Sequence, residues 1–440
     1  MTRHTRLILG ASLAVFAALV ISPCPAAAQP SPETVRLNVE SFEYVWKTIR
    51  DQHFDPTLGG LDWQAVHDEL LPKVQNAQTA EEARAAMTDM IGRLHQSHFA
   101  IIPASLYKDI DAPAKKGGRG GNTGLQFRVI DGRAIMTFVA PGTPGELAGV
   151  RPGWEIRSID GEELPPIFEP IAKEFEGKPR KDYYLWSAVR SRITGPIGDT
   201  LTAVFIDGEN RPAERSMILA EPQGKKVVFG NFPPFYLTYR TDTLADGVGY
   251  FTFSVFFDPV TLMPAFGKAM QSFMNAPGVV IDVRGNPGGI GGMGMGLAGW
   301  FVEEKNVAMG TMRTRSDTLK LVVNPRAKVY KGPVAILVDG LSGSSAEIFS
   351  GGAQGLPRVR IFGSRTIGAT LPSAAERLPN GDGFQYAFAS YISRNGVELE
   401  GEGVHPDVEV RPTREALLEG RDPALEAAID WIRDQHYKGN

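Results

Sequence analysis

Residues 333–349, with the sequence PVAILVDGLSGSSAEIF, constrain the fold of this chain more than any other stretch. The apolar run at 334–338 has the length and the β-branched content of a buried strand, and it stops at Asp339 and Gly340. Small residues follow, and Glu347 falls in the first turn of the helix that they introduce. A buried strand that breaks into a helix presents its turn residues at the carboxyl edge of a sheet, where α/β proteins bind ligands.

Ser344 lies in this turn and has two interpretations. Serine is a good N-cap, so the residue can serve only to begin the helix. The same position also presents a nucleophile beside free helix N–H groups that can hold an anion. The stretch alone favours the cap, and it does not distinguish Ser344 from Ser345 as an attacking group, so the rest of the chain has to decide.

The first 28 residues have the pattern of a signal peptide. Two arginines precede an apolar stretch at 7–21 that is short for a membrane span, and prolines and an Ala-Ala-Ala cleavage pattern follow. Cleavage near Gln29 would remove Cys24, the only cysteine, and leave no disulfide and no thiol nucleophile. We therefore expect an exported protein, periplasmic, of the cell envelope or secreted, with no stable membrane span after signal removal.

The remaining chain divides into three expected domains, which together predict the α/β fold class. Residues 29–114 show helical spacing, with one helix over 63–71 that stops at Pro72 and another that starts at Thr79. Residues 115–222 are rich in strand patterns. Residues 223–440 alternate strands with helices, which predicts a mostly parallel sheet covered by helices.

Composition narrows the function. The net charge is −4 and no basic run is interleaved with aromatic residues, which argues against a nucleic-acid partner. No spacing of His, Asp or Glu suits a metal and no phosphate loop follows a strand, so we expect no metal and no cofactor. No lysine occurs between Lys331 and Lys438, which excludes a Ser–Lys pair with its lysine on the strands just after Ser344. The candidate bases after the signal are therefore histidines: His53, His67, His95, His98, His405 and His436.

The unit at 115–222 resembles a PDZ domain at two places. One is the Gly-Leu-x-Phe loop, whose backbone N–H groups capture a peptide C-terminal carboxylate, and the other is the short helix, turn and strand at 144–156. The resemblance implies a substrate-binding role for Gly124, Leu125, Gln126 and Phe127. A small β-barrel that binds nothing is the alternative.

Four motifs occur in the order found in the C-terminal processing (tail-specific) peptidase superfamily. They are RGNPGG at 284–289, SGSSAE at 342–347, GSRTIGA at 363–369 and EGEGVHPD at 400–407. The chain resembles this superfamily over most of its length after the signal. The resemblance implies a serine peptidase whose sheet domain has the crotonase/ClpP-like spiral fold, behind an N-terminal helical domain and a PDZ domain.

Ala369 departs from the pattern of the processing peptidases, which carry a catalytic lysine at this position. The tricorn-core branch lacks that lysine, and the chain is similar to this branch at Ser97-His98 and at Glu400. The resemblance implies Ser344 as nucleophile and His98 as base, with Ser97 and Glu400 orienting the base.

The sequence also predicts an oxyanion hole. Gly288 and Gly289 leave no side chain to block a substrate carbonyl, and their N–H groups can bind a developing oxyanion together with the N–H of Ser345. A tight turn is the alternative interpretation of the two glycines, and it is weakened because both glycine-rich breaks occur at strand ends, where a site would form.

The leading hypothesis is an exported serine endopeptidase that acts on peptides or proteins through an acyl-enzyme on Ser344. The sequence does not determine whether the protein forms an oligomer. One alternative is a non-catalytic protein that binds a peptide or a hydrophobic ligand, because retinoid-binding relatives, the interphotoreceptor retinoid-binding protein repeats, share this fold. Another is a PDZ adaptor whose sheet domain is only a scaffold.

Overall fold

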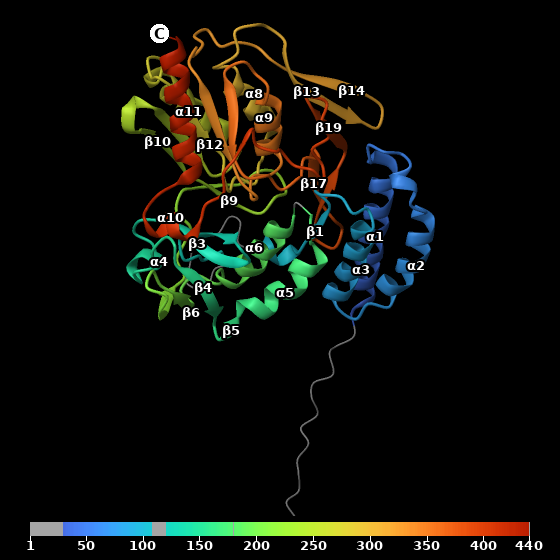
Figure 1. Ribbon diagram of the computed structural model, residues 1–440. Coiled ribbons are helices and arrows are strands. Elements are labelled where there is room, and N and C mark those ends of the chain that lie inside the picture. The colour runs from blue at the N-terminus through green and yellow to red at the C-terminus, as the bar shows by residue number, and fades with distance from the viewer. Residues whose placement is uncertain (1–29, 108–119, 179, 440) are drawn as a thin grey trace, which may run out of the picture.

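The computed structural model describes residues 30–107, 120–178 and 180–439, which form a helical unit, a β-rich unit and a large sheet unit that contact one another (Figure 1). The chain has the mixed α/β fold class that its sequence predicts. The expected signal peptide at 1–28 and the expected boundary at residue 114 lie outside the described residues.

Three helices make up most of the N-terminal unit: α1 (Pro32–Gln52), α2 (Trp63–Gln75) and α3 (Ala80–Gly92). The predicted start of α3 is present, because the hydroxyl of Thr79 accepts the N–H of Glu82 at 3.1 Å. The predicted stop at Pro72 is wrong, since α2 continues to Gln75. Pro72 falls in the last turn, where only one backbone bond is lost, and its carbonyl accepts both the backbone and the side-chain N–H of Asn76.

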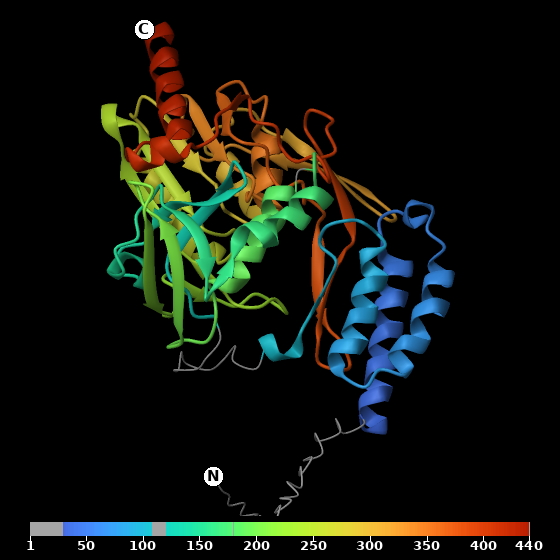
Figure 2. The ribbon, with the colours of Figure 1, turned by 60° about the horizontal axis from the view of Figure 1, so that its bottom comes forward.

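A hairpin from far along the chain completes the core of the helical unit. Strand β1 (Ala100–Ile102) pairs antiparallel with β18 (Gly383–Ala387), which pairs with β17 (Ser373–Arg377). Phe384 and Tyr386 of this hairpin are buried among the side chains of α1, α2 and α3. The hairpin runs beside the three helices in Figure 2, so segments about 280 residues apart share one core.

The β-rich unit consists of a sheet with the strand order β2-β3-β4-β6-β7 and two helices that the sequence reading did not predict. The helices are α5 (Leu164–Glu174) and α6 (Lys181–Arg192). Prolines in α5 and the lack of an apolar stripe on α6 hide both helices from a periodicity search. Helix α6 packs on the edge strand β2, where Trp186 stacks on Phe127 with ring centroids 6.2 Å apart. The strands of this sheet are β2 (Leu125–Ile130), β3 (Arg133–Val139), β4 (Glu155–Ile159), β6 (Thr200–Ile206) and β7 (Pro212–Ile218), with β5 (Glu162–Glu163) paired to β4 and the short helix α4 (Pro144–Leu147) after β3.

The sheet unit is built on a six-stranded sheet with the order β10-β11-β12-β15-β16-β20, parallel except for the β10–β11 pair. Alternate residues of β15 face opposite sides, as expected for a strand buried on both faces. Helices α7, α8 and α9 cover one face and the C-terminal helix α11 covers the other (Figure 1). The strands are β10 (Tyr239–Thr243), β11 (Gly249–Phe253), β12 (Val279–Asp282), β15 (Val334–Val338), β16 (Val359–Gly363) and β20 (Val408–Glu409), and the helices are α7 (Pro259–Ser272), α8 (Gly291–Ala298), α9 (Ser345–Ala353) and α11 (Pro423–Gly439).

Smaller elements flank this sheet. A second sheet has the order β14-β13-β19, and the hairpin of β8 and β9 precedes β10. Their bounds are β13 (Val307–Thr314), β14 (Thr318–Val323), β19 (Ala389–Ser393), β8 (Lys225–Val227) and β9 (Phe235–Leu237), and the short helix α10 (Arg414–Leu418) contacts the β-rich unit through Arg414.

Candidate active site

Ser344 lies at the sharp turn between β15 and α9. Its backbone has a φ of 51° and a ψ of −117°, a conformation that non-glycine residues rarely adopt. Its N–H points at two acceptors, the carbonyl of Ala369 at 2.9 Å and the carboxylate of Glu347 at 3.0 Å. The turn therefore holds the serine in one strained conformation at the carboxyl edge of the sheet.

His98 reaches this serine from the helical unit. It lies between α3 and β1, with a φ of 61°, and its Nε2 atom is 3.2 Å from the Oγ atom of Ser344. The two residues are 246 positions apart, so the contact exists only when β1 and the hairpin of β17 and β18 bring the helical unit onto the sheet unit.

Ser97 links His98 to Glu400 and fixes the tautomer of the imidazole. The hydroxyl of Ser97 donates to Oε2 of Glu400 at 2.8 Å, because an ionised carboxylate can only accept. The same hydroxyl lies 2.7 Å from Nδ1 of His98 and must accept a proton there. Nδ1 therefore carries the hydrogen, and Nε2 is left free to accept the proton of Ser344.

Glu400 is held by donors from three parts of the chain. Oε1 accepts the N–H of Ser97 at 2.9 Å, and Oε2 accepts the N–H of Thr370 at 2.9 Å. Arg180, which immediately precedes α6, donates one Nη2 to Oε1 at 2.5 Å and to the carbonyl of Gly368 at 2.6 Å. The sequence reading missed Arg180, because no motif or spacing relates a residue of the β-rich unit to the terminal glutamate.

Burial dominates the electrostatics of His98. It lowers the pKa of His98 to about 4, with the charge of Glu400 opposing the shift and the charge of Arg180 adding to it. The imidazole is therefore neutral at neutral pH, which is the form that can accept the proton of Ser344.

Glu347 is completely buried, and its carboxylate holds the turn that carries Ser344 through hydrogen bonds. Its carboxylate accepts the N–H groups of Ser344, Gly368 and Ala369 and the hydroxyl of Thr366. Burial raises the pKa of Glu347 to about 7, against the hydrogen bonds from these four donors. The backbone of Ala369 thus helps to hold the turn that carries Ser344.

The three residues expected to form an oxyanion hole do not have equal roles. The N–H of Gly288 is occupied, because it donates to Oδ1 of Asn286 at 2.9 Å, so this part of the expectation disagrees with the structure. Gly288 is instead needed for close approach, since a Cβ there would lie 2.6 Å from Cβ of Ser344. Within the described part of the chain, the N–H groups of Gly289 and Ser345 have no hydrogen-bond acceptor.

The side chain of Ser345 shapes this loop. Its hydroxyl donates to the carbonyl of Gly289 at 2.7 Å, which fixes the peptide plane beside the turn. Ser345 is buried and its hydroxyl is engaged, whereas the hydroxyl of Ser344 faces His98. The sequence does not distinguish Ser344 from Ser345 as the attacking group, but in the structure only the hydroxyl of Ser344 lies next to His98.

The four residues of the expected peptide-binding loop lie at the start of β2. Leu125 and Phe127 are buried and only Gln126 is exposed. The N–H of Gly124 donates to Asn122 Oδ1 at 3.1 Å, and that of Leu125 to Thr123 Oγ1 at 3.4 Å. A peptide carboxylate would have to replace these side-chain acceptors.

Arg128 connects β2 to the nucleophile loop. Its Nε donates to Oδ2 of Asp339 at 2.5 Å, and its Nη1 donates to the carbonyl of Phe127 at 2.9 Å. The other oxygen of Asp339 accepts the N–H groups of Gly285 and Leu341, so one carboxylate joins both loops of the site. The β-rich unit thus contacts the site through two arginines, Arg128 and Arg180.

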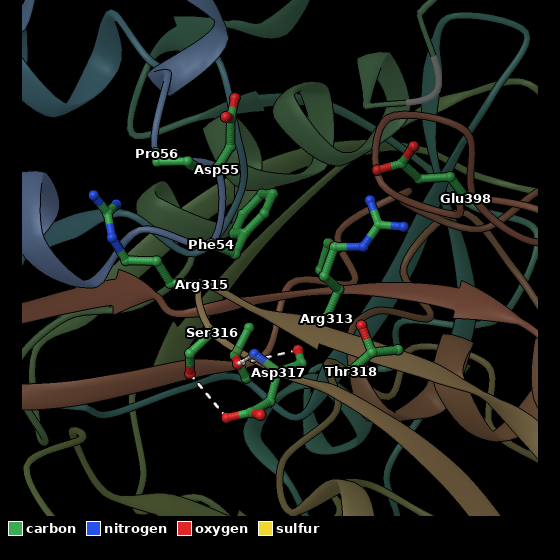
Figure 3. Close-up of a pocket in the computed structure, with 11 residues that line it drawn as sticks. Phe54, Asp55, Pro56, Arg313, Arg315, Ser316, Asp317, Thr318 and Glu398 are labelled. Carbon is green, nitrogen blue, oxygen red and sulfur yellow. Dashed lines mark hydrogen bonds between the residues drawn. The ribbon is translucent and has the colours of Figure 1, made fainter.

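A cavity of about 450 Å³ lies apart from these residues, between the turn after α1 and the hairpin of β13 and β14 (Figure 3). Polar and charged side chains such as Arg313 and Glu398 line it together with Phe54. None of Ser344, His98, Ser97 or Glu400 lines this cavity. Among the described residues, no group of three or more His, Cys, Asp or Glu could hold a metal ion, and no helix is long and apolar enough to cross a membrane.

The comparisons with known families agree with the motifs. Residues 247–410 match the model of peptidase family S41, and residues 39–92 match the model of the tricorn protease C1 domain. The first range holds Ser344 and Glu400 and follows the β-rich unit. The second covers the helices that precede Ser97 and His98.

Two relatives and two solved structures illustrate the likeness. A carboxyl-terminal-processing protease of Picosynechococcus is 23% identical, with 88% of this chain and 87% of that protein aligned. A tricorn protease homolog of Streptomyces coelicolor is 22% identical over 89% of this chain, which spans only 32% of that longer protein. The photosystem II D1 C-terminal processing protease superposes with a TM-score of 0.55 at 19% identity, covering 88% of this chain and 98% of that one. Mature CPAF in complex with lactacystin superposes with a TM-score of 0.63 at 13% identity, covering 92% and 100%. The chain therefore carries a peptidase family S41 domain preceded by a tricorn protease C1 domain, and carboxyl-terminal-processing proteases are its homologues.

Proposed function

We propose that this protein is a serine endopeptidase that forms an acyl-enzyme on Ser344, with His98 as the general base. The observation that carries the proposal is the continuous hydrogen-bond chain from Ser344 Oγ through His98 and Ser97 to Glu400. The 3.2 Å between Ser344 Oγ and His98 Nε2 is within the range of a general base and its proton donor in a resting site.

The chemistry follows from this arrangement. Ser344 Oγ attacks the carbonyl carbon of a peptide while its proton passes to Nε2 of His98, and the resulting oxyanion is stabilised by the N–H groups of Gly289 and Ser345. His98 then gives that proton to the departing amine as the C–N bond breaks. A water molecule next loses a proton to His98 and attacks the ester. This step releases the acid and returns the proton to Ser344.

Glu400 and Arg180 act on the base through Ser97. The imidazolium that forms in each step is stabilised by the negative charge of Glu400, which Ser97 transmits as a hydrogen bond to Nδ1. Arg180 compensates the charge of the carboxylate in a site where water is largely excluded. Both residues are positioning groups, since neither reaches the reacting atoms.

Labelling by a serine-directed fluorophosphonate tests the proposal. We expect the full-length protein to be labelled on Ser344, as located by peptide mass spectrometry, and Ser344→Ala to lose both labelling and cleavage of a casein substrate. Ser316→Ala, at an exposed position on the β13–β14 turn, is the matched control and keeps both. A Ser344→Ala variant that still cleaves casein would show that Ser344 is not the nucleophile. Failure of the folded protein to react would favour a non-catalytic ligand-binding role.

We also propose that the β-rich unit binds the C-terminus of a peptide substrate along β2. Support comes from the PDZ-like motifs and from the position of β2 at the free edge of its sheet, beside α6. Fluorescence anisotropy with Ser344→Ala tests this proposal, because this variant cannot consume its ligand. We expect a peptide with a free C-terminus to bind at least tenfold more tightly than its amidated form, and equal binding would contradict carboxylate capture.

We further propose that the chain is exported, on the basis of the signal-like pattern at residues 1–28. Amino-terminal sequencing of the protein from its native cell tests this. A mature chain that begins near Gln29 in an extracytoplasmic fraction is the expected result, and an uncleaved chain in the cytoplasm would contradict it.

A further inference from the structure

A small cavity with basic walls lies where the β-rich unit meets the sheet unit. It has a volume of about 190 Å³ and is formed by the start of α6, the loop after β16 and the segment after β20. We call it the basic cavity and define it by six of its lining residues: Lys178, Lys181, Asp182, Ser364, Arg365 and Arg411. Several water molecules, at roughly 30 Å³ each, would fill this space, so its natural occupant is a small group rather than a chain segment.

The charges of the basic cavity are not balanced from within. In the part of the chain that the structure describes, neither Lys178 nor Lys181 forms an ion pair with a carboxylate, and Lys178 lies over the ring of Phe175 at 5.3 Å. Asp182 is the one acidic side chain in the wall. Of the four cationic side chains in the wall, Arg365 and Arg411 are each ion-paired with a glutamate, so the two lysines carry the charge that an entering anion would balance.

The two arginines keep donors available for such an anion. Arg365 donates Nε to the backbone carbonyl of Glu402 at 2.5 Å and Nη2 to its carboxylate at 2.7 Å, and Arg411 donates Nε to the carboxylate of Glu409 at 3.0 Å. Both glutamates lie outside the cavity lining, and the remaining guanidinium N–H groups have no acceptor among the described residues. Guanidinium groups match the geometry of carboxylate and phosphate oxygens, and lysine adds a mobile point charge.

We propose that the basic cavity is a binding site for a small oxyanion of the carboxylate or phosphate type. The four cations supply the charge and Ser364 supplies a neutral hydroxyl. The ligand joins segments that are separate in the sequence, because Lys178 and Lys181 belong to the β-rich unit and Arg365 and Arg411 to the sheet unit.

The location gives the bound anion a consequence for the site described above. Lys181 follows Arg180, which holds Glu400, and Arg365 precedes Thr366, which donates to Glu347. An anion that bridges the two segments holds α6 against the loop that supports the nucleophile turn. This consequence rests on the proposed function, whereas the binding itself does not.

Isothermal titration of the full-length protein with inorganic phosphate and, separately, with succinate tests the proposal at constant ionic strength set by chloride. The test variant is Lys178→Gln/Lys181→Gln. The control is Lys173→Gln/Lys320→Gln, which removes the same charge at exposed positions outside the cavity. We expect saturable binding by the wild type and the control, and at least tenfold weaker binding by the test variant. Binding of phosphate alone, of succinate alone or of both supports the site and names its ligand.

Two results would overturn the proposal: no saturable binding of either anion by the wild type, or equal affinities in the wild type and the test variant. Arg411→Gln provides a second variant should the double variant unfold, because the Arg411 side chain is 64% exposed and its loss leaves the core intact. Repeating the titration with Ser344→Ala separates the two proposals, since this variant keeps the anion site whether or not the protein is a peptidase.

Discussion

Glu347 shows how a single buried carboxyl group can set the conformation of the proposed nucleophile, Ser344. Its two oxygens receive four hydrogen bonds, from the turn that carries Ser344 and from the loop at 366–369. The loop at 366–369 contributes two backbone N–H groups and the hydroxyl of Thr366 to this support. Since burial raises the pKa of Glu347 to about 7, the support of the turn has a cost in stability at neutral pH.

Glu347→Gln should therefore change the pH dependence of stability. A carboxyl group whose folded pKa of about 7 exceeds its unfolded value of 4.5 binds its proton more tightly in the folded state. Its contribution to stability is fully present below pH 4.5 and is lost as the pH rises to 7, a loss of about 3 kcal/mol at 1.36 kcal/mol per pKa unit. Urea unfolding at pH 5 and pH 8 measures this. We expect the wild type, relative to Glu347→Gln, to lose stability between these pH values, and a difference that does not change with pH would contradict it.

Ser345→Ala should weaken catalysis without abolishing it. The variant loses the bond from Ser345 Oγ to the carbonyl of Gly289 but keeps the backbone N–H beside the turn. The loss of one neutral hydrogen bond, about 1 kcal/mol, corresponds to a fall in kcat of roughly fivefold to tenfold. Steady-state kinetics and phosphonate labelling measure it, with Ser344→Ala as the inactive reference. Complete loss of labelling in Ser345→Ala would show that Ser345 is the attacking group.

At the scale of elements, α6 has two roles that its sequence does not reveal. It packs on β2 through Trp186, and the residue before its first turn, Arg180, donates a hydrogen bond to Glu400. Through Arg180 and the link from Arg128 to Asp339, the β-rich unit contacts both the relay and the nucleophile loop. Docking of this unit therefore changes the charge around the base as well as the shape of the site.

Arg180→Gln should lower kcat by about 10- to 100-fold with a smaller effect on KM, because a charged hydrogen bond worth about 1.5–3 kcal/mol is lost. The acidic limb of kcat/KM gives a second readout, since it follows the pKa of the free base. In the wild type we expect this limb below pH 6.5, as burial lowers the pKa of His98 to about 4. Removal of the cation should move the limb to higher pH.

Arg192→Gln is the matched control for this prediction. Arg192 lies at the other end of α6 and pairs with Glu162 at the surface at 2.7 Å. Its loss should leave both kcat and the pH profile unchanged. A wild-type profile in Arg180→Gln would show that the arginine only packs against the sheet unit.

The sequence was informative where a residue's role depends on its chain neighbours. Ser344, His98 and Glu400 each lie in a short local motif, and the strand before Ser344 is recognisable by its apolar run. The occupied N–H of Gly288 was also accessible to sequence reasoning, because Asn commonly accepts the N–H of the residue two positions later. Arg180 was not accessible, since its contact with Glu400 depends on the docking of two units 220 positions apart. Helix α5 was missed because prolines interrupt its pattern, and α6 because it has no apolar stripe and is stabilised by tertiary packing.

For the whole molecule, the hairpin of β17 and β18 makes the helical unit and the sheet unit depend on each other. Phe384 and Tyr386 of the sheet unit pack in the core of the helical unit. Strand β1, which follows His98, pairs in turn with β18 of the sheet unit. A chain segment that is expected to belong to the domain at 223–440 thus completes the core of the first domain. We infer that the two units unfold together.

Phe384→Ala tests this coupling. Phe384 is fully buried, so its truncation should lower the free energy of unfolding by about 3–5 kcal/mol and also lower kcat, because β18 positions β1 and with it His98. Urea unfolding followed by tryptophan fluorescence and by peptidase activity measures both effects. Phe138→Ala, at a position 44% exposed, is the control and should cost less than 1 kcal/mol. Two separate transitions in the wild type would contradict joint unfolding.

The distance along the chain between the members of the relay also sets the moment at which the protein can act. Ser97 and Glu400 are 303 positions apart, with Arg180 between them. A ribosome adds the glutamate hundreds of residues after the histidine, so a nascent or prematurely terminated chain that lacks it has no relay. A proteolytic fragment that lacks either Ser97 or Glu400 has no relay for the same reason. If the proposed mechanism holds, activity thus requires that the chain from Ser97 to Glu400 has been made and has remained intact.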